Sequence, residues 1–379
     1  MKHPETAEAP QAAETTIRPG TELLPRVRPA IRFAGMSAVL RVRVLVAVVA
    51  LALAVVVLFA LDISVGDYHI ALDRVVDVLT GGGSRSQRYV IMQSRLPRAV
   101  TALVAGAALG IAGAVTQSIL HNPLASPDLL GITSGASFAA VAVIAGAGGT
   151  ATGIVATLGV PLAALAGGLG TAALIAALAL GRNRGGDTGL SGMRFILIGI
   201  GVNAFLLAGI NWLLTRASLT DASRAQLWLT GSLDGTNWTR AAAAIAGLTV
   251  VAAITLGSAR SLAALRFGTD TTRALGVRLQ TQQLVLIGAA VAAAALATAA
   301  VGPLVFVGLA APQIARRLLR TPGEPILGAA LTGAVIVIAA DVAARTVVPV
   351  DLPVGLLTAA FGGPFLLLLL IRVNRKATL

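Results

Sequence analysis

The chain has 379 residues, of which 56% are hydrophobic and 12% charged, and its mean hydropathy is +0.86, which excludes an ordinary soluble globular protein. The net charge of +13 suggests nucleic acid, but the basic residues flank apolar runs, which is typical of membrane loops. The absence of cysteine excludes disulfides, thiolate metal sites and cysteine nucleophiles.

The first 40 residues are rich in Ala, Pro, Glu and Thr and then in Arg, which predicts a disordered cytoplasmic tail before a membrane domain over residues 41–379. Apolar runs recur along that domain, each long enough to cross a hydrocarbon core of roughly 30 Å. The first run lies too far from the start to be a cleaved signal peptide. We therefore expect an all-α polytopic membrane protein with about ten spans, at residues 44–62, 98–119, 129–147, 153–180, 194–214, 241–257, 282–300, 303–319, 326–344 and 355–371.

The distribution of Lys and Arg predicts the orientation of these spans. Of the 29 basic residues, 20 lie in segments that this topology places on one side and 9 on the other. Cytoplasmic loops carry the excess of positive charge, so both termini are expected in the cytoplasm. The outer loop at 63–97 contains a predicted short helix, over residues 68–79, which Gly81 follows.

A polar break separates the second and third predicted spans, running from His121 through Asn122, Pro123 and Leu124 to Asp128. Irregular backbone near membrane depth is tolerated only where protein or water covers it. The break therefore indicates a pathway or its mouth.

An inner loop at 265–277 predicts a short amphipathic helix, which Thr269 or Asp270 could cap and Gly276 could end. Such a helix can lie on the bilayer surface or dock on a cytoplasmic partner, and its spacing alone favours neither.

Several kinds of chemistry have no residues to carry them. The two lysines, Lys2 and Lys376, belong to no Gly-rich GK[ST] loop, so we expect no nucleotide site or cofactor in this chain, and no catalytic residues. The three histidines form no pair at metal-ligand spacing, so no metal site is expected. Asp341 is the one acid in the interior of a predicted span and precedes Arg345 by four residues, which predicts a structural ion pair. An ion-coupled secondary transporter, which usually has acids in mid-membrane, and a non-transporting scaffold are the alternatives from other classes.

Several ordered motifs resemble those of the FecCD (vitamin B12 and ferric-siderophore) permease family, the membrane subunits of type II ABC importers. They are Arg95-Leu96-Pro97-Arg98, Asn122-Pro123-Leu124-Ala125-Ser126-Pro127-Asp128, Trp228-Leu229-Thr230-Gly231-Ser232-Leu233, Leu275-Gly276-Val277, Gly302-Pro303-Leu304-Val305-Phe306-Val307-Gly308-Leu309 and Leu352-Pro353-Val354-Gly355. The resemblance implies a BtuC-like fold of ten helices in the bacterial inner membrane. It also implies a second permease subunit (a paralogue or a second copy), two cytoplasmic ATPases that bind ATP and Mg, and a periplasmic or lipoprotein binding protein.

The resemblance also implies roles for particular residues. Arg95 and Arg345 match arginines that receive glutamates of the binding protein. The cytoplasmic gate maps to Asn122, Pro123 and Leu124, with a second element at Ser191 and Gly192. The coupling helix that seats in the ATPase maps to Gly268, Asp270, Arg273, Ala274, Leu275 and Gly276.

The implied cargo is a ferric siderophore, and the motifs at 122–128 and 312–317 are most similar to those of permeases for the catecholate enterobactin. Haem or a cobalamin is the alternative within the family. On either reading the chain is a transport subunit and not itself an enzyme.

Overall fold

The computed structural model describes residues 30–33, 36–39, 41–66, 68, 70–147, 153–179, 192–265, 267, 269–274, 276, 278–347 and 351–377. The predicted site residues outside these ranges are Ser191, Gly268 and Leu275. Only the backbone is described for Gly192, Asp270 and Arg273. The chain divides into two compact units, Met1–Leu45 and Val46–Leu379.

The first unit contains two short strands, β1 (Ala30–Phe33) and β2 (Met36–Val39), which pair antiparallel. Their register sets Ile31 opposite Ala38 and Phe33 opposite Met36. Both strands lie within the segment 1–40, for which the composition predicts a disordered tail. The rest of the predicted tail, residues 1–29, 34, 35 and 40, lies outside the described residues.

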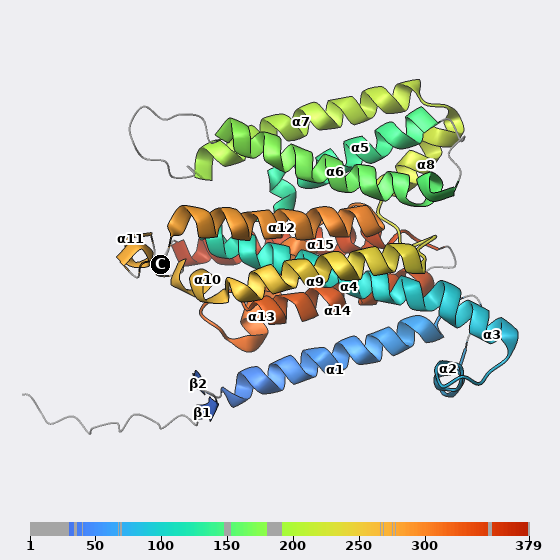
Figure 1. The fold of residues 1–379 in the computed structure, drawn as a ribbon, viewed down its shortest axis with the longest axis horizontal. Helices are drawn as coiled ribbons and strands as arrows, with labels where there is room; N and C mark the ends of the chain where they lie inside the picture. The colour runs from blue at the N-terminus through green and yellow to red at the C-terminus, as the bar shows by residue number, and fades with distance from the viewer. Residues whose placement is uncertain are drawn as a thin grey trace, which may run out of the picture. The chain divides into compact units, whose positions relative to one another are not determined.

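Apart from these strands, the described part of the chain is helical (Figure 1). The helices are α1 (Val42–Ser64), α2 (Leu72–Leu79), α3 (Arg85–Tyr89), the π-helix η1 (Val90–Arg95), α4 (Leu96–Leu120), the 3-10 helix η2 (Pro127–Leu130), α5 (Ile132–Ala147), α6 (Gly153–Ala179), α7 (Gly192–Arg216), α8 (Leu219–Leu229), α9 (Trp238–Gly257), α10 (Ala259–Leu265), α11 (Thr269–Ala274), α12 (Leu279–Val301), α13 (Val307–Leu319), α14 (Ile326–Thr346) and α15 (Val354–Ala377).

Eight helices of the described residues are long and apolar enough to cross a membrane, whereas the sequence predicts about ten spans. Helices form at all ten predicted places, but α5 has 16 residues and α13 has 13. At 1.5 Å per residue α13 is only about 20 Å long, against a core of roughly 30 Å. It is short because Gly302 and Phe306 both have positive φ, and the segment that they bracket leaves the helical path.

The outer loop predicted at 63–97 is also shorter than expected. Helix α2 ends at Leu79 as predicted but begins at Leu72 and not at residue 68, and a second helical stretch begins at Arg85 and continues into α4, giving 36 helical residues. Ser84 and Gln87 form a reciprocal capping box at its start. The π-helix η1 ends two residues before Pro97, and such a widened turn accommodates the disturbance of the hydrogen-bond ladder near a proline. The prediction placed a boundary where the helix continues.

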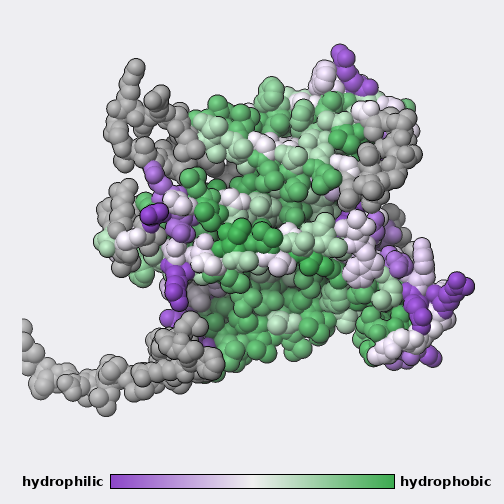
Figure 2. All heavy atoms as spheres, in the orientation of Figure 1, coloured by the Kyte–Doolittle hydropathy of each residue, from purple (hydrophilic) through white to green (hydrophobic). Residues whose placement is uncertain are grey.

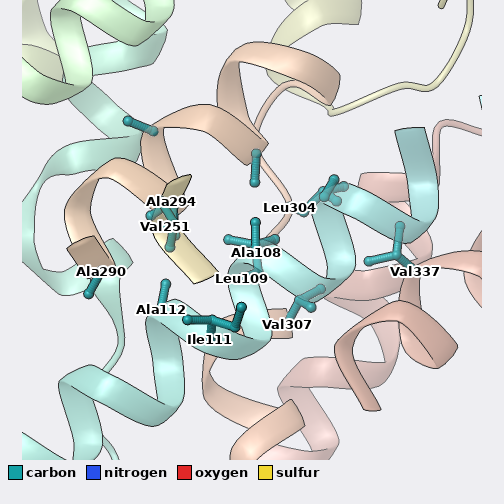
Figure 3. Packing of buried hydrophobic residues seen from close by; sticks show 14 of the residues in the cluster. Ala108, Leu109, Ile111, Ala112, Val251, Ala290, Ala294, Leu304, Val307 and Val337 are labelled. Atoms are coloured by element: carbon teal, nitrogen blue, oxygen red, sulfur yellow. The ribbon is translucent and has the colours of Figure 1, made fainter. Parts of the chain in front are cut away.

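Helix α4 lies at the centre of the second unit and packs against α9, α12, α13 and α14 (Figure 1). Its close neighbours meet it backbone to backbone: a Cβ added at Gly113 would lie 1.7 Å from the Gly308 oxygen, and one at Gly106 would lie 2.4 Å from the Gly333 oxygen. Small residues allow this approach between membrane helices, where lipid gives no hydrophobic drive for association. Figure 3 shows the alanines, leucines and valines that fill the spaces around α4.

Helices α5, α6 and α7 pack on one another, and α5 and α6 also contact α12. On the face drawn in Figure 2, apolar side chains cover the flanks of the long helices, and hydrophilic residues gather near the helix ends. This distribution is the one that a bilayer requires. The candidate functional residues accordingly lie at the two ends of the helices.

Candidate functional site

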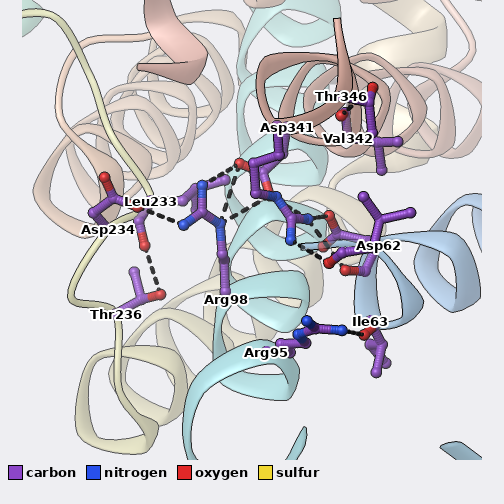
Figure 4. A network of polar contacts seen from close by, with 12 residues as sticks. Asp62, Ile63, Arg95, Arg98, Leu233, Asp234, Thr236, Asp341, Val342 and Thr346 are labelled. Carbon is purple, nitrogen blue, oxygen red and sulfur yellow. Dashed lines mark hydrogen bonds and ion pairs between the residues drawn. The ribbon is translucent and has the colours of Figure 1, made fainter. Parts of the chain in front are cut away.

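At the N-terminal end of α4, a chain of charged side chains joins three helices and a loop (Figure 4). Arg98 donates from Nε to Asp341 Oδ2 at 3.0 Å and from Nη2 to Asp341 Oδ1 at 2.8 Å. Its remaining Nη1 pairs with Asp234, whose side chain is 69% exposed. Such a two-point contact between guanidinium and carboxylate fixes orientation as well as charge.

Arg345 is the second cation on Asp341. Its Nη2 lies 3.0 Å from Asp341 Oδ2, in the i,i+4 arrangement expected from the sequence. The same guanidinium pairs with the Asp62 carboxylate and donates to the Val65 carbonyl oxygen at 2.8 Å. Asp341 and Asp62 are 0% and 1% exposed, so this ion-pair chain is enclosed by the helices that contribute to it.

Arg95 also binds the end of α1. It donates from Nη1 to the carbonyl oxygens of Ile63 at 2.8 Å and Ser64 at 2.9 Å, and from Nη2 to that of Tyr68. The last carbonyls of a helix have no partner within the helix, and a cation there complements the helix dipole. Arg95 is 7% exposed, so both predicted docking arginines are engaged with α1 in this conformation.

Sequence reasoning named Asp341 and Arg345 but assigned no role to Arg98 or Asp62. The motif that contains Arg95 also contains Arg98, and Asp62 is the acid at the end of the first apolar run. These two features were the sequence signals that could have pointed to Arg98 and Asp62. Neither reveals that Arg98 meets an aspartate 243 residues away.

At the opposite end of α4, the polar break folds into a tight turn. His121 ends the helix in the left-handed region with φ 50°, and Asn122 Oδ1 accepts from the Leu124 N–H at 2.9 Å. The Ala125 N–H donates to the Asn122 carbonyl oxygen at 3.1 Å. The predicted gate residues Asn122, Pro123 and Leu124 thus form one compact turn, with Asn122 exposed and the other two half-buried.

The second predicted gate element lies at the start of α7. Gly192 begins this helix, and its predicted companion Ser191 falls outside the described residues. The structure therefore describes contacts for the turn at the end of α4 only.

Asp128 closes the break. The Ser126 hydroxyl donates to Asp128 Oδ2 at 3.1 Å, and the Thr133 hydroxyl donates to Oδ1 at 2.6 Å. Burial raises the pKa of the Asp128 carboxyl above its usual range, and the hydrogen bonds from Thr133 and Ser126 act in the opposite direction. The carboxyl fixes the path of η2 into α5.

Two polar contacts in the same half of α4 have no counterpart in the sequence analysis. Gln313 donates from Nε2 to Gln117 Oε1 at 2.6 Å, and Gln117 donates to the Leu309 carbonyl oxygen at 3.2 Å. Both glutamines are buried, and they join α4 to α13. The sequence signal for this contact was a glutamine within each apolar helix, because a buried side-chain amide needs hydrogen-bond partners.

The predicted coupling segment contains α11, followed by Gly276 at φ 75°, which matches the predicted helix end. The Thr272 hydroxyl donates to the Ala264 carbonyl oxygen of α10 at 2.9 Å, and Thr272 is fully buried. Ala274 is exposed. The hydrogen bond from Thr272 therefore holds α11 against α10, while Ala274 of the same helix is accessible.

Across the parts of the chain that the structure describes, no three His, Cys, Asp or Glu residues come together as metal ligands. In the residues that the structure describes, eight long apolar helices define a multi-pass membrane protein. Comparison with known sequences shows that the chain belongs to the FecCD transport family, whose pattern matches residues 52–372.

Two relatives and one solved structure show how far the similarity extends. The ferric enterobactin transport system permease protein FepG of Escherichia coli (strain K12) is 40% identical over 314 residues, 82% of this chain and 91% of that protein. The iron(3+)-hydroxamate import system permease protein FhuG of Bacillus subtilis (strain 168) is 35% identical over 327 residues, 84% of this chain and 94% of that protein. An inward-facing structure described as a metal-chelate type ABC transporter has a TM-score of 0.73 and 26% identity, covering 86% of this chain and 98% of that one.

Proposed function

We propose that this chain is the permease subunit of an ABC importer that moves a ferric siderophore, of the catecholate enterobactin type, into the cytoplasm. The observation that carries the proposal is the 40% identity to a ferric enterobactin permease across 82% of the chain. The relative named for iron(3+)-hydroxamate import supports iron chelates as the wider class. A haem or cobalamin importer of the same family is the second candidate.

The buried charges favour an importer with an external energy source over an ion-coupled carrier. Coupling through a carboxylate requires an acid that can exchange its ion during transport. In the described residues Asp341 is held by two guanidinium groups and Asp62 by one. We therefore propose that ATP and Mg bind to two partner ATPase subunits and that this chain holds no nucleotide site.

We assign the partner contacts by position. Residues 268–276 seat in an ATPase, the 122–124 turn with Ser191 and Gly192 forms the cytoplasmic gate, and the binding protein docks near Arg95 and Arg345. Because both arginines now hold the end of α1, docking of glutamates requires that they release carbonyls there. A second permease subunit, either a paralogue or a second copy, completes the pathway. Residues 1–40 form a cytoplasmic tail, residues 41–379 form the permease domain of the bacterial inner membrane, and both termini lie inside.

Uptake of radio-iron by an iron-starved deletion strain tests the cargo. The native gene should restore uptake from ferric enterobactin, and excess unlabelled ferric enterobactin should compete while haem and cobalamin should not. Competition by haem or cobalamin in place of the siderophore would move the assignment to the second candidate. Failure of every iron chelate to enter would overturn the siderophore proposal.

The energy source is tested in the same cells. Vanadate, which traps ABC ATPases, should stop uptake, and a protonophore should not when cellular ATP is maintained. The Asp270→Ala, Arg273→Ala double variant should lose uptake at native membrane levels, whereas Arg224→Ala, an exposed arginine of α8, should retain it. Loss of uptake with the protonophore alone would favour the ion-coupled carrier.

A further inference from the structure

The last turn of α10 receives hydrogen bonds from two elements that the proposed function assigns to different tasks. The Ala264 carbonyl oxygen accepts from the Thr272 hydroxyl of α11 at 2.9 Å. The adjacent Leu265 carbonyl oxygen lies 3.1 Å from His121 Nε2, at the end of α4. Terminal carbonyls of a helix have no partner within it, so side chains from outside can hold them.

Apolar packing fixes this junction as well. Leu262 and Leu265 of α10 are 1% and 3% exposed, and they belong to the same buried cluster as Ile119 in the last turn of α4. The two carbonyl oxygens therefore sit on a short helix that is itself anchored to α4. A shift of α11 is transmitted to α10 through one contact and onward to α4 through another.

His121 makes the polar contact between α10 and α4. Its backbone is left-handed, with φ 50° and ψ 30°, and its Nδ1 lies 3.1 Å from the Ile119 carbonyl oxygen. A carbonyl oxygen only accepts, so Nε2 holds Leu265 when it carries a proton. The residue that follows is Asn122, whose side chain closes the gate turn.

We propose that His121 and Thr272 are positioning residues that link the coupling helix to the gate turn through the two terminal carbonyls of α10. The proposal rests on the proposed function, because it needs an ATPase on α11 and a gate at residues 122–124. Movement of α11 during the ATP cycle then displaces the gate turn directly, without rearrangement of the membrane-spanning core.

Substitutions at His121 can remove its contact with the Leu265 carbonyl oxygen and still preserve the backbone of the turn. In His121→Gln the side-chain amide can take the place of Nε2, whereas in His121→Asn it can reach only the position of Nδ1. Asn and Gly both tolerate the left-handed backbone, so they preserve the turn while removing the contact with Leu265. At position 272, Thr272→Ser keeps the hydroxyl and Thr272→Val removes it with little change in shape.

The experiment uses the complete complex, with its partner permease, ATPases and binding protein, in proteoliposomes. ATP hydrolysed per ferric enterobactin transported is measured in one preparation. We expect a ratio within about twofold of native for His121→Gln and Thr272→Ser, and a rise of about fivefold for His121→Asn, His121→Gly and Thr272→Val, as loss of one hydrogen bond implies. The His121→Asn, Thr272→Val double variant should be no worse than either single one, because both interrupt one connection.

Native ratios in His121→Asn and His121→Gly would overturn the proposal, and so would additive effects in the double variant. Equal uncoupling by His121→Gln and His121→Asn would also contradict it, because the defect would then follow the loss of the ring and not of the contact. A native complex that imports no siderophore would show failure of the proposed function itself, which is a different result from any of these.

Discussion

Asp341 joins two guanidinium groups of the polar network at the N-terminal end of α4. Arg98 contacts both of its oxygens and Arg345 contacts one, while Asp234 pairs with Arg98 from a largely exposed position. The contribution of each ion pair to the free energy of unfolding depends on its burial. Removing one partner of an enclosed pair leaves an uncompensated charge, whereas an exposed pair exchanges its partner for water.

We therefore expect Asp341→Asn to lower the free energy of unfolding by about 3–5 kcal/mol. The matched variant Asp234→Asn, which removes the other carboxylate from the same arginine, should cost about 0–1 kcal/mol. Thermal unfolding of the two purified variants in the same detergent measures the difference. Equal losses would contradict the assignment of Asp341 as the centre of the network.

Asp128 gives a prediction about pH. Its pKa is raised by burial, so the folded state holds the proton longer than the unfolded state does. The resulting stability is complete below the unfolded pKa, near pH 4, and is lost as the pH rises from there through the folded pKa. The Asp128→Asn variant has no carboxyl to ionise at this position, so it does not lose this stability. As the pH rises through this window, its unfolding midpoint should therefore rise relative to that of the native protein. A difference that stays constant with pH would show that the carboxyl is not shifted.

Local sequence spacing predicts one contact of this network and not the others. The Asp341–Arg345 contact lies within one helical turn, and spacing alone predicts it. Arg98 reaches Asp341 across most of the chain, and the two arginines that the motifs single out turn inward toward α1. Contacts between distant segments depend on how the helices assemble, which no local pattern records.

At the scale of helices, the contacts of α4 depend on residues without side chains. We expect Gly113→Ala to force α4 away from α13, because the new Cβ would lie 1.7 Å from the Gly308 oxygen. Overpacking of this kind costs about 1–3 kcal/mol. Gly170→Ala, in a helix where a Cβ meets nothing within 4 Å, is the control and should be neutral or slightly stabilising. Unfolding temperatures compare the two, and equal behaviour would contradict the close contact.

Apolar periodicity predicted where the helices lie better than where they end. Runs of alanine, leucine and valine predicted each helix of the bundle, and the short helix α2 also lies where expected. The boundary at Pro97 was wrong because a proline can follow a π turn inside a continuous helix. The span at 303–319 was too long because Phe306 takes a left-handed backbone that its residue type does not announce.

At the scale of the whole molecule, the charge distribution predicts which loops face the cytoplasm. The absence of cysteine gives a clean background for labelling. With a membrane-impermeant maleimide, Ser86→Cys should react in intact spheroplasts and Gln280→Cys only after permeabilisation, since both positions are exposed in the described structure. The native protein should give no signal. Reaction of Gln280→Cys in intact spheroplasts would reverse the proposed topology.

The attachment of α1 has a consequence for how this protein can change. Arg95 and Arg345 grip backbone oxygens, those of Ser64, Val65 and Tyr68 among them, and every amino acid supplies such an oxygen. Apart from the pairing of Arg345 with the Asp62 carboxylate, these contacts depend on the course of the main chain and not on the side chains along it. Gly66 in this turn is constrained, because an added Cβ would lie 2.8 Å from Arg95 Nη2, and a residue inserted or deleted in the turn would shift the acceptors together. A change in the length of this turn is therefore tolerated less well than most substitutions within it.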